Sequence, residues 1–102
     1  MIDRSLEGRT AIITGAGRGL GKSMAEGLAA QGANITLVDL EEDVLAMATA
    51  DVEAAGGQGS ALAVSADVTV LDQAEAAINR TIDIFGGLDI LINDAAMGPQ
   101  FF

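Results

Sequence analysis

Four short apolar runs alternate with three longer runs of helical periodicity, and this alternation restricts the fold more than any other feature. The expected strands are Thr10–Thr14, Asn34–Val38, Ser60–Ser65 and Leu88–Ile92. The expected helices are Leu20–Gly32, Glu41–Ala55 and Val70–Phe85. Strands that are separated by a helix cannot form hairpins, so they pair in parallel with right-handed crossovers. The order βαβαβαβ therefore predicts an α/β fold with a parallel sheet and helices on both faces.

Each expected helix carries an apolar stripe at helical spacing that we expect to face the sheet. The stripes are Leu20, Met24, Ala25, Leu28 and Ala29 in the first helix, Val44, Leu45, Ala48, Val52 and Ala55 in the second, and Ala74, Ala77, Ile78, Ile82 and Phe85 in the third. Glycine pairs at 56–57 and 86–87 are expected to end the second and third helices. The spacings of Asp39 to Glu42 and of Thr69 to Asp72 fit capping boxes.

Composition narrows the class of protein. The chain has 102 residues, which fits one small domain over residues 1–102. Its 15 acidic and 5 basic residues give a net charge of -10, which argues against DNA, RNA or anionic membranes as partners. The absence of cysteine excludes disulfides and a thiolate metal site, and we expect no metal. Neither a signal peptide nor an apolar run of membrane length is visible, so we expect a cytoplasmic protein.

A glycine-rich segment at 14–21 joins the first expected strand to the first expected helix. Glycine lets a backbone turn tightly and approach a phosphate closely, and the helix N-terminus attracts the anion. The common dinucleotide fingerprint Gly-x-Gly-x-x-Gly does not fit this segment. A P-loop fits only its end, Gly21-Lys22-Ser23, because Ala16 occupies the leading glycine position. A phosphate cradle is the leading interpretation, with a P-loop nucleotidase as a remote alternative.

The pattern Thr-Gly-x-x-x-Gly-x-Gly does fit, at Thr14, Gly15, Gly19 and Gly21. Here the chain resembles the short-chain dehydrogenase/reductase family. The lead-in at 6–11, an acid at Asp39, the pair Asp67-Val68 and the segment 93–96, similar to Asn-Asn-Ala-Gly, match the family in order. The resemblance implies a Rossmann-type fold truncated after the fourth strand, which is the N-terminal, NAD-binding part of an oxidoreductase.

The resemblance also implies a set of cofactor-binding residues. They are Gly15, Arg18, Gly19, Leu20, Gly21, Asp39, Leu40, Asp67, Val68, Asn93 and Ala95. In this family the acid at Asp39 accepts hydrogen bonds from the adenosine ribose, which implies NAD over NADP. A basic residue at Arg18 contacts the 2′-phosphate in the NADP-using branch, whereas Leu40 offers no cation. Asp67 is expected at the adenine amino group, with Val68 against the ring.

The segment at 93–96 departs from the family. Asn93 and Ala95 are expected where the chain passes the cofactor. Asp94 replaces the second asparagine and adds an acid beside the expected diphosphate, and Ala96 replaces glycine.

No catalytic residue of the family is expected in this chain. The family uses a Ser and a Tyr-x-x-x-Lys beyond the Asn-Asn-Ala-Gly segment, and this chain contains no tyrosine. We expect hydride transfer between nicotinamide and an alcohol or carbonyl substrate only in a longer enzyme, of which this chain is a fragment and which the family suggests is a homo-oligomer. The alternative is a non-catalytic nucleotide-binding or interaction module.

Overall fold

The computed structural model describes residues 5–94 and contains the seven expected elements in the expected order. The strands are β1 (Thr10–Thr14), β2 (Asn34–Asp39), β3 (Ala61–Ser65) and β4 (Ile90–Asn93). The helices are α1 (Gly19–Ala30), α2 (Glu42–Gly56) and α3 (Leu71–Phe85). The predicted parallel α/β architecture is confirmed, with only small shifts of the element ends. None of the helices within residues 5–94 combines the length and apolar character needed to span a membrane.

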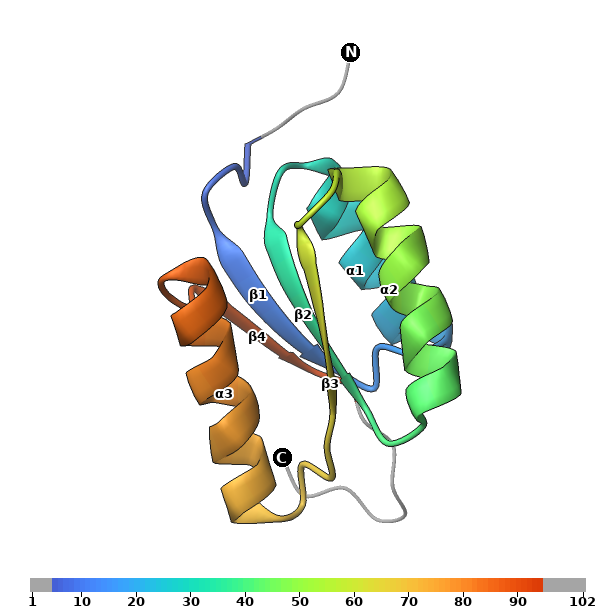
Figure 1. Ribbon diagram of the computed structural model, residues 1–102. Coiled ribbons are helices and arrows are strands. Elements are labelled where there is room, and N and C mark those ends of the chain that lie inside the picture. The colour runs from blue at the N-terminus through green and yellow to red at the C-terminus, as the bar shows by residue number, and fades with distance from the viewer. Residues whose placement is uncertain (1–4, 95–102) are drawn as a thin grey trace.

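The four strands form one parallel sheet in the order β3-β2-β1-β4. The chain builds outward from β1 through β2 to β3 and then returns across the sheet to place β4 on the other side of β1 (Figure 1). The direction of growth thus reverses at β1. β4 lies at an edge of the sheet, and its Leu91 side chain is largely exposed.

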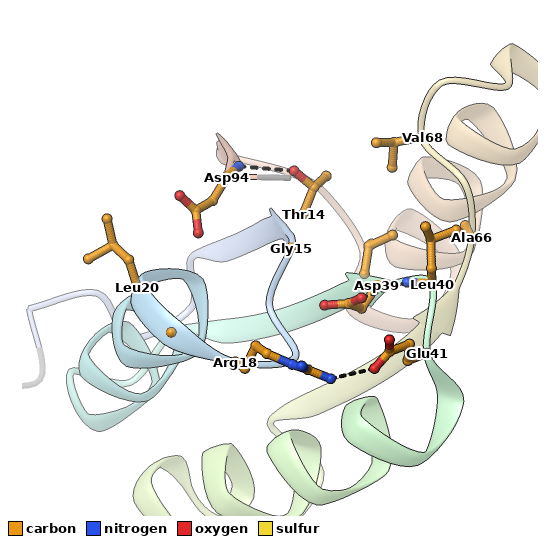
Figure 2. A pocket seen from close by; sticks show the side chains of 12 residues that line it. Thr14, Gly15, Arg18, Leu20, Asp39, Leu40, Glu41, Ala66, Val68 and Asp94 are labelled. Carbon is orange, nitrogen blue, oxygen red and sulfur yellow. Dashed lines mark hydrogen bonds and ion pairs between the residues drawn. The ribbon is translucent and has the colours of Figure 1, made fainter. Parts of the chain in front are cut away.

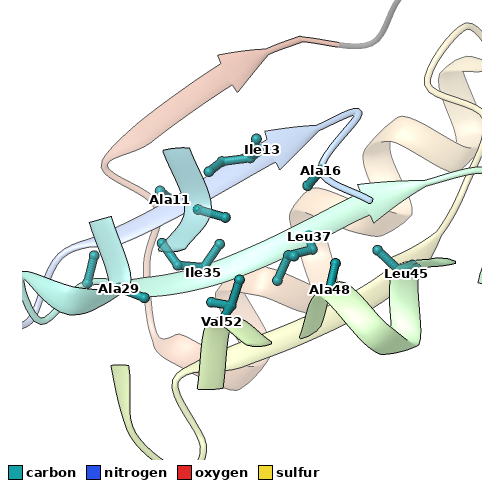
Figure 3. Packing of buried hydrophobic residues seen from close by; sticks show 11 residues of the cluster. Ala11, Ile13, Ala16, Ala29, Ile35, Leu37, Leu45, Ala48 and Val52 are labelled. Carbon is teal, nitrogen blue, oxygen red and sulfur yellow. The ribbon is translucent and has the colours of Figure 1, made fainter. Parts of the chain in front are cut away.

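Helices cover both faces of the sheet, as expected for strands with apolar residues on each side. Helices α1 and α2 pack on one face, where alanines on the helices let them approach the sheet closely (Figure 3). This cluster includes Ala11, Ile13, Ile35, Leu37, Ala25, Ala29, Leu45, Ala48 and Val52. Helix α3 covers the opposite face, around Ile12, Val38, Val64, Ala66 and Ala77.

Some positions of the predicted helix stripes are wrong. Leu20 is 66% exposed, Ile82 is 43% exposed, and Ala55 is exposed as well. In α3 the buried residue Thr81 faces the sheet instead. Its hydroxyl oxygen lies 2.8 Å from Thr36 Oγ1 on β2 and 2.8 Å from the Ala77 carbonyl oxygen. A polar residue is thus accommodated in the core through hydrogen bonds that a hydrophobic pattern does not reveal.

Both predicted capping boxes are wrong, whereas the predicted glycine ends are confirmed. The residues before α1, α2 and α3 make no side-chain capping hydrogen bond. The carboxylate of Asp39 accepts hydrogen bonds from other N–H groups, and the Thr69 hydroxyl donates to Asp67 at 2.6 Å. Helix α2 ends at Gly56, and Gly86 ends α3 with a φ of +89°, a conformation that favours glycine.

Candidate functional site

A cleft of about 500 Å³ opens at the carboxyl ends of the strands (Figure 2). Its lining comes from the ends of β1 and β2 and from the segments that follow all four strands. The lining residues are Thr14, Gly15, Arg18, Gly19, Leu20, Val38, Asp39, Leu40, Glu41, Ala66, Val68 and Asp94. Since β2 and β4 flank β1, the cleft lies where the direction of strand addition reverses. In open α/β sheets this is the place where ligands bind.

The glycine turn between β1 and α1 forms one wall of the cleft. Gly15 and Gly19 have φ angles of +67° and +65°, which residues with a side chain rarely adopt. Gly21 lies inside the first turn of α1, where a Cβ would collide with the carbonyl oxygen of Gly15. The turn therefore packs directly on the start of α1. The first turn of α1 contains no acidic residue, so its free N–H groups form a site that favours an anion.

The Asp39 carboxylate lies at the end of β2, between the two loops that border the cleft. Its Oδ2 accepts a hydrogen bond from the Gly17 N–H at 2.8 Å, and its Oδ1 accepts one from the Leu40 N–H at 2.7 Å. These two bonds fix the orientation of the carboxylate. Each oxygen keeps a further lone pair that can accept a ligand hydroxyl.

Gly17 is a structural requirement of this arrangement that the sequence motif did not predict. A Cβ on Gly17 would lie 2.6 Å from Asp39 Oδ2 and 2.9 Å from the Val44 side chain. Only glycine lets this backbone N–H reach the carboxylate. The one signal in the sequence is an extra glycine within the turn, outside the family pattern.

Arg18 and Glu41 face one another beside Asp39 and form an ion pair (Figure 2). Arg18 precedes α1 and Glu41 precedes α2, so the pair joins the loops that follow β1 and β2. The side chains are 68% and 62% exposed. The sequence predicted Arg18 for this site but placed Glu41 only at the start of the second expected helix, because a contact between residues 23 positions apart leaves no local pattern.

The ends of β1 and β4 are joined through the side chain of Thr14. Its hydroxyl donates to Asn93 Oδ1 at 2.7 Å, and the Asp94 N–H lies 3.1 Å from Thr14 Oγ1. Asn93 thus ties the strands together and does not line the cleft. Asp94 does line it, and a Cβ on Gly21 would lie 3.0 Å from Asp94 Oδ2. An acidic side chain therefore lies next to the N-terminus of α1.

Asp67 lies in the turn after β3, outside the cleft lining. Its Oδ1 accepts hydrogen bonds from the hydroxyl and the N–H of Thr69, at 2.6 and 2.9 Å. These bonds, above all the one from the hydroxyl, lower the pKa of the Asp67 carboxyl. Its neighbours Ala66 and Val68 line the cleft as apolar side chains.

Lys22 is not placed to bind a phosphate, as the lysine of a P-loop would. Its ammonium lies 2.8 Å from Asp51 on α2 and 3.5 Å from Glu26, and it does not line the cleft. The hydrogen bond to Asp51 is the main cause that raises the pKa of Lys22. Because a P-loop lysine binds the phosphates directly, this pairing disfavours that alternative.

The structure thus brings together most of the residues that the sequence predicted. Those lining the cleft are Gly15, Arg18, Gly19, Leu20, Asp39, Leu40 and Val68. Gly21, Asp67 and Asn93 lie beside it, and Ala95 lies outside the described residues. The site list drawn from the sequence lacked Thr14, Val38, Glu41, Ala66 and Asp94. Between residues 5 and 94 there is no group of three or more His, Cys, Asp or Glu side chains that could hold a metal ion.

Comparisons with known proteins agree with this geometry. A family model described as short chain dehydrogenase matches residues 9–102. Galactitol 2-dehydrogenase of Agrobacterium fabrum is 41% identical over 92 residues, which cover 90% of this chain and 34% of that protein. The chain therefore spans about a third of the length of this relative.

Solved structures of dehydrogenases and a reductase share the fold of this chain. The apo form of glucose dehydrogenase from Caenorhabditis elegans superposes with a TM-score of 0.86 at 32% identity, covering 92% of this chain and 40% of that one. NAD+-bound xylitol dehydrogenase gives a TM-score of 0.85 at 30% identity, covering 91% of this chain and 35% of that one. A 3-ketoacyl-(acyl-carrier-protein) reductase from Brucella melitensis, complexed with NADH, gives 0.77 at 38% identity, covering 85% and 34%.

Proposed function

Because this chain belongs to the short-chain dehydrogenase/reductase family, we propose that its cleft binds the adenosine and diphosphate part of a nicotinamide dinucleotide. The observation that carries the proposal is the Asp39 carboxylate, held by two backbone N–H groups beside a glycine turn that opens a helix. Residues 1–102 then belong to one dinucleotide-binding domain. We also propose a cytoplasmic location.

The residues of the cleft fit such a ligand. Gly15 and Gly19 keep side chains out of the turn, so the diphosphate can approach the N–H groups at the start of α1. The fixed Asp39 carboxylate can accept hydrogen bonds from the two hydroxyls of the adenosine ribose. Ala66 and Val68 provide apolar surface for the adenine ring. The proposed cofactor-binding roles of Leu20 and Leu40 are supported by their place in the cleft lining. Those of Asp67, Asn93 and Ala95 rest on the family resemblance alone.

We further propose NAD rather than NADP as the preferred cofactor. A 2′-phosphate on the adenosine ribose would lie against the Asp39 carboxylate, and two negative charges at close range repel one another. The preference is consistent with the NAD+-bound and NADH-bound relatives described above.

In a longer protein that contains this domain, we propose hydride transfer between the nicotinamide and an alcohol or carbonyl substrate. The nicotinamide supplies or accepts the hydride when it is bound. This chain contains no tyrosine, histidine or cysteine, so it lacks the tyrosine that transfers the proton in this family. We therefore propose that the 102-residue chain binds the cofactor and does not turn over substrate.

The first prediction tests the ribose assignment by replacing Asp39 with alanine. Loss of the hydroxyl–carboxylate hydrogen bonds is expected to weaken NAD binding about tenfold or more, with a smaller loss for NADP. Isothermal titration calorimetry of the 102-residue chain with each cofactor measures both constants. Asp43→Ala is a matched control, because Asp43 carries the same charge, is exposed and does not line the cleft. An equal loss for NAD and NADP would contradict the assignment.

A further inference from the structure

We infer that Glu41 is a specificity-determining residue of the cleft, because it engages the guanidinium of Arg18 and withholds it from a phosphate on the adenosine ribose. The inference rests on the proposed function, since it assumes that the ribose lies at Asp39. Glu41 would then be a second residue, besides Asp39, that disfavours binding of 2′-phosphorylated nucleotides.

The ion pair lies directly beside the Asp39 carboxylate, where the ribose is proposed to bind. Gly17 donates its N–H to Asp39, so the next residue, Arg18, begins directly beside that carboxylate. Glu41 follows Asp39 by two positions, on the opposite loop. Both side chains line the cleft, and they meet one another there (Figure 2). A phosphate attached to the ribose would therefore enter the space that the ion pair borders.

The charged side chains that line the cleft are mostly acidic. Arg18 is the only basic residue among the described residues that line the cleft, whereas Asp39, Glu41 and Asp94 are acidic. A guanidinium binds a phosphate through paired, charge-assisted hydrogen bonds, so Arg18 alone could offset the charge of a 2′-phosphate. Glu41 engages Nη2 of this guanidinium, which leaves fewer N–H donors for a phosphate. The negative charge of Glu41 also offsets the charge of Arg18 and repels a phosphate beside the pair.

The exposure of the pair limits the size of the effect and makes it measurable. With side chains 68% and 62% exposed, the pair is weakened by solvent and salt, so Glu41 shifts a preference and does not hold the cleft together. Replacement by glutamine keeps the shape of the side chain and removes its charge. We expect the Glu41→Gln chain to fold as the unaltered one does, which far-ultraviolet circular dichroism checks.

The test compares two nucleotides that differ by one phosphate, 5′-AMP and adenosine 2′,5′-bisphosphate. Calorimetry gives the affinity of each for the unaltered 102-residue chain and for Glu41→Gln. We expect Glu41→Gln to improve binding of the bisphosphate about three- to tenfold relative to 5′-AMP, the range for a solvent-exposed charge. Glu41→Ala, which likewise cannot form the ion pair with Arg18, is expected to change the relative affinity in the same direction. Glu42→Gln is the matched control, because Glu42 is the exposed neighbouring acid and does not line the cleft.

A double-mutant cycle separates engagement of Arg18 from plain repulsion by Glu41. If Glu41 acts by engaging the guanidinium, the gain from Glu41→Gln largely disappears when Arg18 is also replaced by glutamine. An equal gain in both backgrounds would overturn the inference, as would no gain at all in a chain that binds 5′-AMP. If the unaltered chain binds neither 5′-AMP nor NAD, the proposed function fails and the inference fails with it.

Discussion

At the scale of single residues, Asp94 has two opposing effects. Its carboxylate lies beside Gly21 at the N-terminus of α1, where the helix dipole favours a negative charge. In the ligand-free protein this placement stabilises the fold. A diphosphate in the same cleft would instead be repelled by it. Affinity and stability should therefore respond to this residue with opposite signs.

We predict that Asp94→Asn strengthens NAD binding about three- to tenfold and lowers the free energy of unfolding by about 0.3–1 kcal/mol. Calorimetry measures the affinity, and urea denaturation measures the stability. Asp83→Asn serves as a control, since Asp83 is exposed on α3 and does not line the cleft. A loss of both affinity and stability would mean that Asp94 acts through a hydrogen bond and not through its charge.

The residues that the sequence could predict are those whose chemistry is local. Asp39 follows an apolar strand at a fixed distance from the glycine turn, so its place at the end of β2 could be read from spacing. Glu41 could not, because its role depends on Arg18, 23 positions away. The capping predictions failed for a related reason. Asp39 and Thr69 had better partners than helix N–H groups, in Gly17 and Asp67, and spacing alone does not rank partners.

At the scale of secondary structure elements, α1 shows how tightly a helix can be joined to the loop before it. Two of its glycines sit in contrasting surroundings. A Cβ on Gly21 would collide with the backbone carbonyl of Gly15, whereas a Cβ on Gly27 would meet nothing within 4 Å. The first glycine is required by packing, and the second only adds backbone freedom that folding must remove.

We predict that alanine at these two positions has opposite effects on unfolding in urea. Gly21→Ala should destabilise the protein by about 1–3 kcal/mol, because two backbone segments must separate, and should weaken NAD binding as the turn shifts. Gly27→Ala should stabilise it by about 0.5–1 kcal/mol and leave NAD binding unchanged. Each variant is the other's control for an added methyl group in α1. Equal effects would show that the contact with Gly15 relaxes without cost.

Element types and approximate ends could be predicted because glycines separate the periodic runs, as at Gly56 and Gly86. The order of strands in the sheet could not be derived from the same signals. Alternation of strand and helix is equally compatible with β4 beside β3, yet β4 pairs with β1. That return across the sheet creates the cleft, so the pattern predicted the glycine turn without predicting which strand ends would surround it.

At the scale of the whole molecule, the net charge of -10 acts on any anionic ligand. The radius of gyration is 12.5 Å, and the Debye length is about 30 Å at 0.01 M salt and about 10 Å at 0.1 M. At low salt, therefore, nearly all the charges of the protein act on a dinucleotide, and their net negative sum repels it. At moderate salt only the charges near the cleft act on it.

We predict that NAD binding becomes about two- to fivefold tighter when the salt concentration rises from about 0.01 to about 0.1 M. The backbone N–H groups of the turn act at short range, so screening should weaken them little. Calorimetry at pH 7 in potassium chloride measures the change, with sucrose at equal osmolality as a control. Weaker binding at the higher salt concentration would instead identify Arg18 as the dominant charge felt by the ligand.

The hydrogen bond between Thr14 and Asn93 joins residues 79 positions apart. On a ribosome that adds roughly 5–20 residues per second, the fourth strand emerges roughly 4–16 s after the first. Once β2 has emerged, β1 can pair with it, while the opposite edge of β1 still presents unpaired N–H and C=O groups to other nascent chains. β1, an inner strand of the sheet, thus has an open edge until β4 emerges, and crowding on polysomes is where this topology is most vulnerable.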